Sequence, residues 1–180
     1  RRCKLVLQLY ALINGENNLK LKPKIICADS LRHNWNDIFQ VNGLDYIVGN
    51  PPYVNIHDMN INTVEFLKAN FKTTVTGVFN IFYAFIEHAM KFLKNDGKLC
   101  YIIPNNFLTI KSAEDIRKFI TENKYLECII DFADNMVFKP VRTYNCIIEL
   151  SKKNNVEVNY CVLEKKINIE DGNAKEQVLN

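Results

Sequence analysis

The stretch that most constrains the fold is residues 45–53, an apolar run that ends abruptly at Asn-Pro-Pro-Tyr. The run at 45–48 is apolar and β-branched, which is typical of a strand buried on both faces of a sheet. Proline has no N–H for a strand ladder, and it keeps the residue before it extended. The chain must therefore leave the sheet at Asn50 as a stiff loop, with Tyr53 at its tip.

This loop offers a small set of recognition groups. In an open α/β sheet, ligands bind in the crevice at the carboxyl ends of the strands. Asn50 supplies a carboxamide oxygen, Pro51 a backbone carbonyl that no ladder needs, and Tyr53 an aromatic face. Two acceptors beside a flat ring suit a planar group that carries an NH2. Asn-Pro-Pro alone is also common in loops without a function, so the interpretation depends on the strand before it and the tyrosine after it.

The rest of the chain alternates strands and helices. Helical spacing of apolar residues predicts helices over 1–13, 35–40, 61–71 (or an irregular lid there), 78–93 and 112–123. Strands are predicted over 24–31, 98–104, 126–132, 144–150 and 156–163 in addition to 45–48. This order predicts a mostly parallel α/β sheet covered by helices on both faces, with the strand at 144–150 inserted antiparallel.

Two helix boundaries carry recognisable signals. The Asn95-Asp96-Gly97 sequence is expected to end the helix at 78–93 and to turn the chain into the next strand. Ser112 is expected to cap the helix that follows, because Asp115 three residues later completes a pattern that resembles a capping box.

Composition excludes few classes of protein. The chain of 180 residues is 48% apolar and 24% charged, which is ordinary for a soluble globular domain. No apolar run could span a bilayer and no signal peptide is visible, so a cytoplasmic location is the default expectation.

The six cysteines form no C-x-x-C pair and no metal spacing with histidine, so no metal is expected. Cys27, Cys100, Cys128 and Cys146 are predicted to be buried core thiols. A net charge of +3 is compatible with nucleic acid but hardly informative.

Together these motifs resemble the gamma-class, adenine-specific N6 DNA methyltransferases of restriction–modification systems, including those fused to a nuclease. The matching stretches are 28–31, 45–54, 80–85, 97–104 with Phe107-Leu108, and Phe138 followed by 143–147. Asn-Pro-Pro-Tyr alone is shared with other methyltransferases, but the set in this order is fairly specific. The resemblance implies that the chain is the C-terminal part of a Rossmann-like, S-adenosylmethionine-dependent methyltransferase domain.

The resemblance also implies roles at the target base. The family flips an adenine out of double-stranded DNA, and Asn50 and Pro51 would accept its two amino hydrogens. That would aim the nitrogen lone pair at the sulfonium methyl by positioning and electrostatics, without a strong base. Tyr53 and Phe138 would stack on the flipped base, offsetting a flipping cost of a few kcal/mol, since each stack returns about 1–3 kcal/mol.

The remaining residues carried over by the resemblance bind S-adenosylmethionine. Asp29 would accept from the amino group of the cofactor's adenine, and Ser30, Pro52 and Phe85 would line its pocket. The residues themselves leave alternatives open. A carboxylate such as Asp29 at a strand end also caps turns, and Phe85 could equally be a core residue of its helix.

Two features of the family are not found: the glycine-rich loop after its first strand and the acidic residue that holds the cofactor's ribose. Residues 1–13 look like the helix after that acid, and no nuclease motif is present. We therefore expect residues 1–153 to be a partial catalytic domain without its N-terminal third. Residues 154–180 are expected to be an extra strand and a linker toward a target-recognition domain.

Three other functions stay open. A glutamine carboxamide also presents a planar NH2, so a protein-glutamine N5 methyltransferase is one alternative. Cytosine N4 methylation is another, although Ser usually replaces Asn in that class. The third is an inactive, DNA-binding remnant of a truncated gene.

Overall fold

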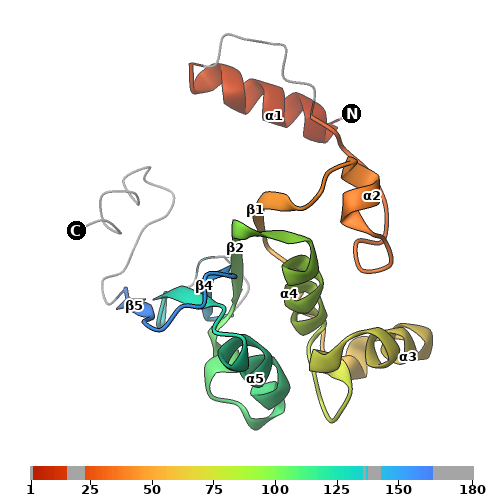
Figure 1. Cartoon of the computed structure of the whole chain (residues 1–180), viewed down its shortest axis with the longest axis vertical. Helices are drawn as coiled ribbons and strands as arrows, with labels where there is room; N and C mark the ends of the chain where they lie inside the picture. The colour runs from red at the N-terminus through yellow and green to blue at the C-terminus, as the bar shows by residue number, and fades with distance from the viewer. Residues whose placement is uncertain (1, 16–22, 136, 138–142, 164–180) are drawn as a thin grey trace. The chain divides into compact units, whose positions relative to one another are not determined.

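The structure, a computed structural model, describes residues 2–15, 23–135, 137 and 143–163. The chain divides into two compact units, Arg1–Val41 and Asn42–Asn180. The elements and their order are drawn in Figure 1.

The first unit contains the helices α1 (Arg2–Ile13) and α2 (Trp35–Phe39), as predicted. The Asn34 side chain caps α2 by accepting a hydrogen bond from the Asn36 N–H. The strand predicted over 24–31 is wrong, because the described residues 23–31 form an extended segment and a turn without a ladder. A strand requires a neighbour for its backbone hydrogen bonds, and no described strand pairs with this segment. Ile25 and Ile26 are accordingly exposed.

The second unit contains a five-stranded sheet in the order β1-β2-β4-β3-β5. The strands are β1 (Leu44–Gly49), β2 (Leu93–Pro104), β3 (Leu126–Asp131), β4 (Asn145–Ser151) and β5 (Asn159–Val162). β1 is parallel to β2 and β3 is parallel to β5, whereas β4 is antiparallel to both of its neighbours. All the strands of this sheet except β4 therefore run the same way, which confirms a mostly parallel sheet with an antiparallel insertion.

In the described part of this unit, three helices and four short 3-10 turns connect the strands. The helices are α3 (Ile61–Asn70), α4 (Ile81–Phe92) and α5 (Glu114–Glu122), and the turns are η1 (Ile56–Asp58), η2 (Lys72–Thr74), η3 (Asn105–Leu108) and η4 (Lys111–Ala113). Asn60 and Asn80 cap α3 and α4, because their side chains accept hydrogen bonds from the N–H groups of Thr63 and Phe82.

The predicted cap of α5 is wrong. Ser112 lies inside η4, and α5 begins at Glu114 without a hydrogen bond from a capping side chain. The Asp115 carboxylate instead accepts from the Thr76 hydroxyl at 2.8 Å, so a contact distant in sequence replaces the local box.

The helix predicted over 78–93 ends within one residue of its predicted end, but the role predicted for Asn95-Asp96-Gly97 is wrong, because these residues lie within β2. The helix stops at Phe92, and the buried Leu93 already pairs with Leu44 of β1. A Cβ at Gly97 would lie 2.8 Å from the Leu44 carbonyl oxygen. This glycine therefore lets β1 and β2 approach each other and does not end the helix.

Within the second unit, α4 and α5 cover one face of the sheet. Both helices contact η2 and line one common cavity, so they lie on the same side. The core between these helices and the sheet consists of fully or nearly fully buried apolar side chains: Phe82, Ile86, Leu99, Ile103, Ile116, Ile120, Ile148 and Leu150.

The opposite face of the sheet is less buried. Cys100, Ile102 and Ile147 are half-buried there, and Tyr46 and Val48 of β1 are 74% and 76% exposed. Burial of β1 on both faces and helices on both faces of the sheet are therefore wrong for this unit. In the described part of the chain β1 is an edge strand that pairs only with β2. Of the four cysteines predicted to be buried, only Cys146 is.

Candidate active site

The candidate site starts where β1 ends. Asn50 is exposed, Pro51 is buried, and Tyr53 is half-buried. The Tyr53 hydroxyl donates a hydrogen bond to the Ile102 carbonyl of β2 at 2.8 Å. Its ring packs edge-on against Phe82 of α4, with ring centroids 6.2 Å apart and planes at 78°. The loop after β1 is thus attached to the neighbouring strand and to the covering helix.

The far side of the loop is fixed by backbone hydrogen bonds. The Ile56 N–H donates to the Phe79 carbonyl at 3.0 Å, and the Ile81 N–H donates to the Val54 carbonyl at 2.9 Å. Residues 54–56 are therefore joined to the start of α4, and the four residues 50–53 are held at both ends. Such attachment limits the movement of the backbone that carries the Asn50 carboxamide and the Pro51 carbonyl.

The electrostatics make Tyr53 a neutral group. Burial, with a smaller contribution from the buried Cys146 thiol, raises the pKa of Tyr53 to about 12. The phenol therefore stays protonated at neutral pH and serves as a donor to β2, not as a base. The Asn50 side chain makes no hydrogen bond within the described residues, so its carboxamide oxygen is available to a ligand.

Asp29 and Ser30 lie in a turn of the first unit. The Asp29 carboxylate accepts from the Leu31 N–H and from Arg32 Nε, both at 3.1 Å, so it does cap the turn. Two carboxylate oxygens offer about four lone-pair positions, which leaves acceptor capacity on this exposed group. The Ser30 carbonyl accepts from Trp35 Nε1 at 2.8 Å. Asp29 and Ser30 belong to the first unit and Asn50 to the second, so their joint role stays a prediction.

The two predicted phenylalanines differ in outcome. Phe85 is half-buried on α4, between the fully buried Ala84 and Ile86, so its ring is not a simple core residue. Pro52 is exposed. Phe138 lies outside the described residues, and its stacking role stays a prediction.

The sequence did not single out one cluster at the same edge. Asp131 at the end of β3 is 9% exposed, and it accepts hydrogen bonds from Asn105 Nδ2 at 3.0 Å, the Ala133 N–H at 2.9 Å and the Tyr160 hydroxyl at 3.1 Å. Asn105 follows directly after β2. Asn105 and Asp131 each lie at the end of an apolar run, as Asp29 and Asn50 do, but nothing in the sequence pairs the two.

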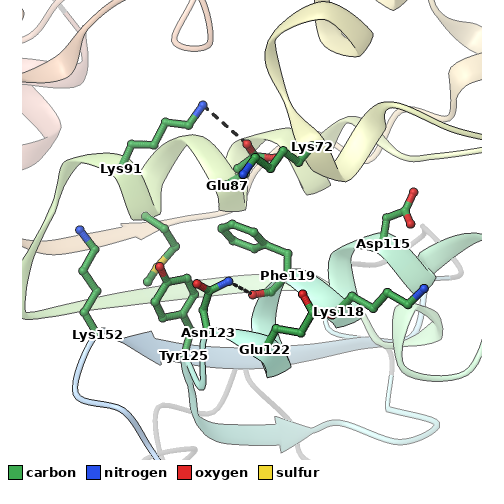
Figure 2. Close-up of a pocket in the computed structure, with 11 residues that line it drawn as sticks. Lys72, Glu87, Lys91, Asp115, Lys118, Phe119, Glu122, Asn123, Tyr125 and Lys152 are labelled. Carbon is green, nitrogen blue, oxygen red and sulfur yellow. Dashed lines mark hydrogen bonds and ion pairs between the residues drawn. The ribbon is translucent and has the colours of Figure 1, made fainter.

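A separate cavity of about 520 Å³ opens between α4 and α5 (Figure 2). Tyr125 just before β3 and Lys152 just after β4 lie at one end of it, so the cavity reaches the amino edge of the parallel strands. Its lining includes the Glu87–Lys91 ion pair at 3.6 Å. None of the predicted site residues lines it, and it is not part of the candidate active site.

No helix of the described ranges is long and apolar enough to cross a membrane. No three His, Cys, Asp or Glu side chains in those ranges gather to hold a metal ion.

Comparison with known sequences gives a family. Residues 5–138 match the family model described as Eco57I restriction-modification methylase. The type II restriction enzyme and methyltransferase RM.Eco57I of Escherichia coli is 38% identical over 128 residues. That alignment covers 66% of this chain but only 13% of the length of the E. coli enzyme.

Solved structures share the fold. A class I S-adenosylmethionine-dependent methyltransferase from Listeria monocytogenes has a TM-score of 0.58 at 23% identity, over 77% of this chain and 42% of that one. The type IIL restriction-modification enzyme MmeI, solved in complex with DNA, has a TM-score of 0.66 at 19% identity, over 82% of this chain and 20% of that one. The sheet is therefore part of a Rossmann-like methyltransferase domain. Because the family model matches well over half of its residues, the chain belongs to the Eco57I restriction-modification methylase family.

Proposed function

We propose that this chain is part of an enzyme that methylates the N6 amino group of adenine in double-stranded DNA, using S-adenosylmethionine, in a restriction–modification system. The observation that carries the proposal is the Asn50–Tyr53 loop. It leaves β1 at the carboxyl edge with a free carboxamide oxygen, and Tyr53 is fixed to both β2 and α4. Membership of a restriction-modification methylase family supplies the class of reaction.

The proposed chemistry is positioning of a weak nucleophile. The lone pair of adenine N6 is delocalised into the ring. If Asn50 Oδ1 and the Pro51 carbonyl accept its two hydrogens, the nitrogen moves toward tetrahedral geometry and its lone pair becomes available. The Tyr53 ring offers a face for stacking. Its bonded hydroxyl fixes the ring axis, and the contact with Phe82 restrains rotation about that axis.

The residues present fit S-adenosylmethionine chemically. The cofactor supplies an electrophilic methyl group on a sulfonium. The exposed Asp29 carboxylate retains acceptor capacity for an adenine amino group, and the half-buried Phe85 and exposed Pro52 offer apolar surface.

We also propose that residues 1–153 belong to the catalytic domain and that 154–180 lead toward a target-recognition domain.

Other functions are less well supported. Family membership does not favour the protein-glutamine alternative. DNA as substrate is supported by the fold neighbour MmeI, which was solved with DNA. Analysis of the methylated nucleosides separates adenine N6 from cytosine N4 directly.

The test is Asn50→Ala in the complete protein that contains this chain. Genomic DNA from cells expressing the wild-type protein is digested, and N6-methyladenine and N4-methylcytosine are quantified by mass spectrometry. We expect N6-methyladenine from the wild-type protein. In the purified variant the methylation rate should fall about tenfold to hundredfold, because an unmade buried hydrogen bond costs about 1–3 kcal/mol.

The matched control is Asn95→Ala, which removes an exposed carboxamide without a hydrogen-bond partner in the described structure. It should leave the rate unchanged. The proposal fails if the wild-type protein methylates no adenine, or if Asn50→Ala is as active as Asn95→Ala.

A further inference from the structure

Asp131 connects three parts of the carboxyl edge of the sheet. Its Oδ1 accepts from Asn105, which lies 26 residues earlier and just after β2, and from the Ala133 N–H in the turn after β3. Its Oδ2 accepts from the Tyr160 hydroxyl on β5. The Asp131 carboxylate is thus only 9% exposed and accepts from three donors. Capping the turn after β3 would need only one of them, the Ala133 N–H.

Asn105 connects this carboxylate to the candidate active site. It lies three residues after Ile102, whose carbonyl holds the Tyr53 hydroxyl. Its backbone N–H donates to the Tyr144 carbonyl at 3.0 Å, and its side-chain Nδ2 donates to Asp131 at 3.0 Å. The carboxyl end of β2, on which Tyr53 rests, is thus attached to the chain beside β4 and to the end of β3.

The charge of Asp131 matters to this arrangement. A carboxylate only accepts, so the nitrogen of the Asn105 carboxamide must face it and the oxygen must face away. The same carboxylate holds the Ala133 N–H in a turn where Ala133 has φ 47°, a left-handed conformation that costs a non-glycine residue energy.

We propose that Asp131 and Asn105 form a positioning pair for methyl transfer, which holds the carboxyl end of β2 and therefore Tyr53 in place against the target base. This inference rests on the proposed function. Neither residue is assigned contact with the reacting atoms, so the pair acts through Tyr53 and not as a catalytic group.

The test starts from Asn105→Asp in the complete enzyme. This change places two carboxylates where one carboxylate and one amide lay 3.0 Å apart. When both are charged they repel and the end of β2 moves, and as pH falls one proton is shared and the contact re-forms. Relative to wild type, kcat should fall about tenfold to hundredfold at high pH and recover as pH falls. The KM for S-adenosylmethionine should stay unchanged.

The reversed pair Asn105→Asp with Asp131→Asn restores one donor and one acceptor. It should recover part of kcat at high pH, where the single variant is impaired. In DNA that the wild-type enzyme methylates, 2-aminopurine at the target position reports the flipped base by fluorescence. That signal should fall in Asn105→Asp and return in the reversed pair.

The control is Asp134→Asn, the same chemical change as Asp131→Asn but three residues further along the chain. The Asp134 side chain is exposed and has no hydrogen-bond or ion-pair partner among the described residues. It should leave kcat, its pH profile and the fluorescence at wild-type values. The inference is overturned if Asn105→Asp has a wild-type pH profile, or if the reversed pair is no better than the single variant. If the wild-type enzyme itself methylates no adenine, the proposed function has failed instead.

Discussion

At the scale of single residues, Tyr53 is held by its polar end. Its hydroxyl is bonded to the backbone of β2 and its ring makes a T-shaped contact with Phe82, while the side chain stays only half-buried. A backbone carbonyl is a fixed acceptor, so it fixes the direction of the ring axis, and the contact with Phe82 restrains rotation about that axis. An aromatic face prepared in this way loses little further entropy when a base stacks on it.

Tyr53→Phe isolates that hydroxyl. The variant keeps the ring but leaves the Ile102 carbonyl without its donor, so unfolding free energy at neutral pH should fall by about 0.5–1.5 kcal/mol. Urea unfolding of the complete protein at pH 7 measures the change. A variant as stable as the wild type would show that the hydrogen bond contributes nothing net.

The stability difference between wild type and Tyr53→Phe should also depend on pH in the alkaline range. The pKa of Tyr53 is raised from 10.0 to about 12, so the folded protein retains a proton that the unfolded chain loses first. Its contribution to stability is complete below pH 10 and is lost as pH rises from 10 to 12. The stability difference between wild type and Tyr53→Phe should therefore shrink across that window, while other buried tyrosines affect both proteins equally.

At the scale of elements, the close approach of β1 to β2 depends on Gly97. A Cβ there would lie 2.8 Å and 2.9 Å from the carbonyl oxygens of Leu44 and Asp45, and backbone cannot move as a side chain can. We expect Gly97→Ala to lower the unfolding free energy by about 1–3 kcal/mol. It should also reduce methylation, because β1 carries Asn50.

Gly49→Ala is the matched control for Gly97→Ala. Its new Cβ would meet a Tyr101 ring atom at 3.3 Å, which a small side-chain shift relieves. Urea midpoints of the two variants should differ clearly in the complete protein. Equal midpoints would mean that β1 can move away from β2 without cost.

Most elements could be predicted from the sequence because their signals are local. Helical periodicity and short β-branched runs give the identity of α4, β1 and β3 without tertiary information. Burial and pairing are not local. The run at 24–31 has the composition of a strand but no described partner, and the exposed Tyr46 shows that an apolar strand can lie at an edge.

The candidate site, too, was predictable only where its signal is local in the sequence. The Asn50–Tyr53 loop is contiguous, and its geometry follows from two prolines and the strand before them. The Asp131–Asn105 contact joins residues 26 positions apart, and only the order of the strands brings them together. A single sequence contains no signal that selects this pair from the other polar residues at strand ends.

At the scale of the whole molecule, each of the two units exposes large apolar side chains. Tyr46 and Val48 are about three-quarters exposed in the second unit, and Tyr10 and Ile13 are 68% and 82% exposed in the first. Exposed apolar side chains that gather on a surface mark interaction sites or cause association. We expect the isolated chain of 180 residues to bind the dye ANS and to self-associate in sedimentation experiments.

A double variant tests which surface is responsible. Tyr46→Thr with Val48→Thr keeps β-forming residues on β1 and removes its exposed apolar groups. It should lower ANS fluorescence and shift the chain toward monomer. The expectation would be contradicted if the wild-type chain were monomeric and did not increase ANS fluorescence.

The direction of β4 has a consequence for how this family can vary. Because β3 and β4 are antiparallel neighbours, the chain that joins them starts and ends at the carboxyl edge, whatever its length. A parallel crossover would have to return to the opposite edge. Each doubling of a flexible connection costs only about 0.6 kcal/mol. Insertions between Phe132 and Tyr144 can therefore add new side chains at this edge of the sheet at small thermodynamic cost, which makes this connection a natural position for divergence and for engineering.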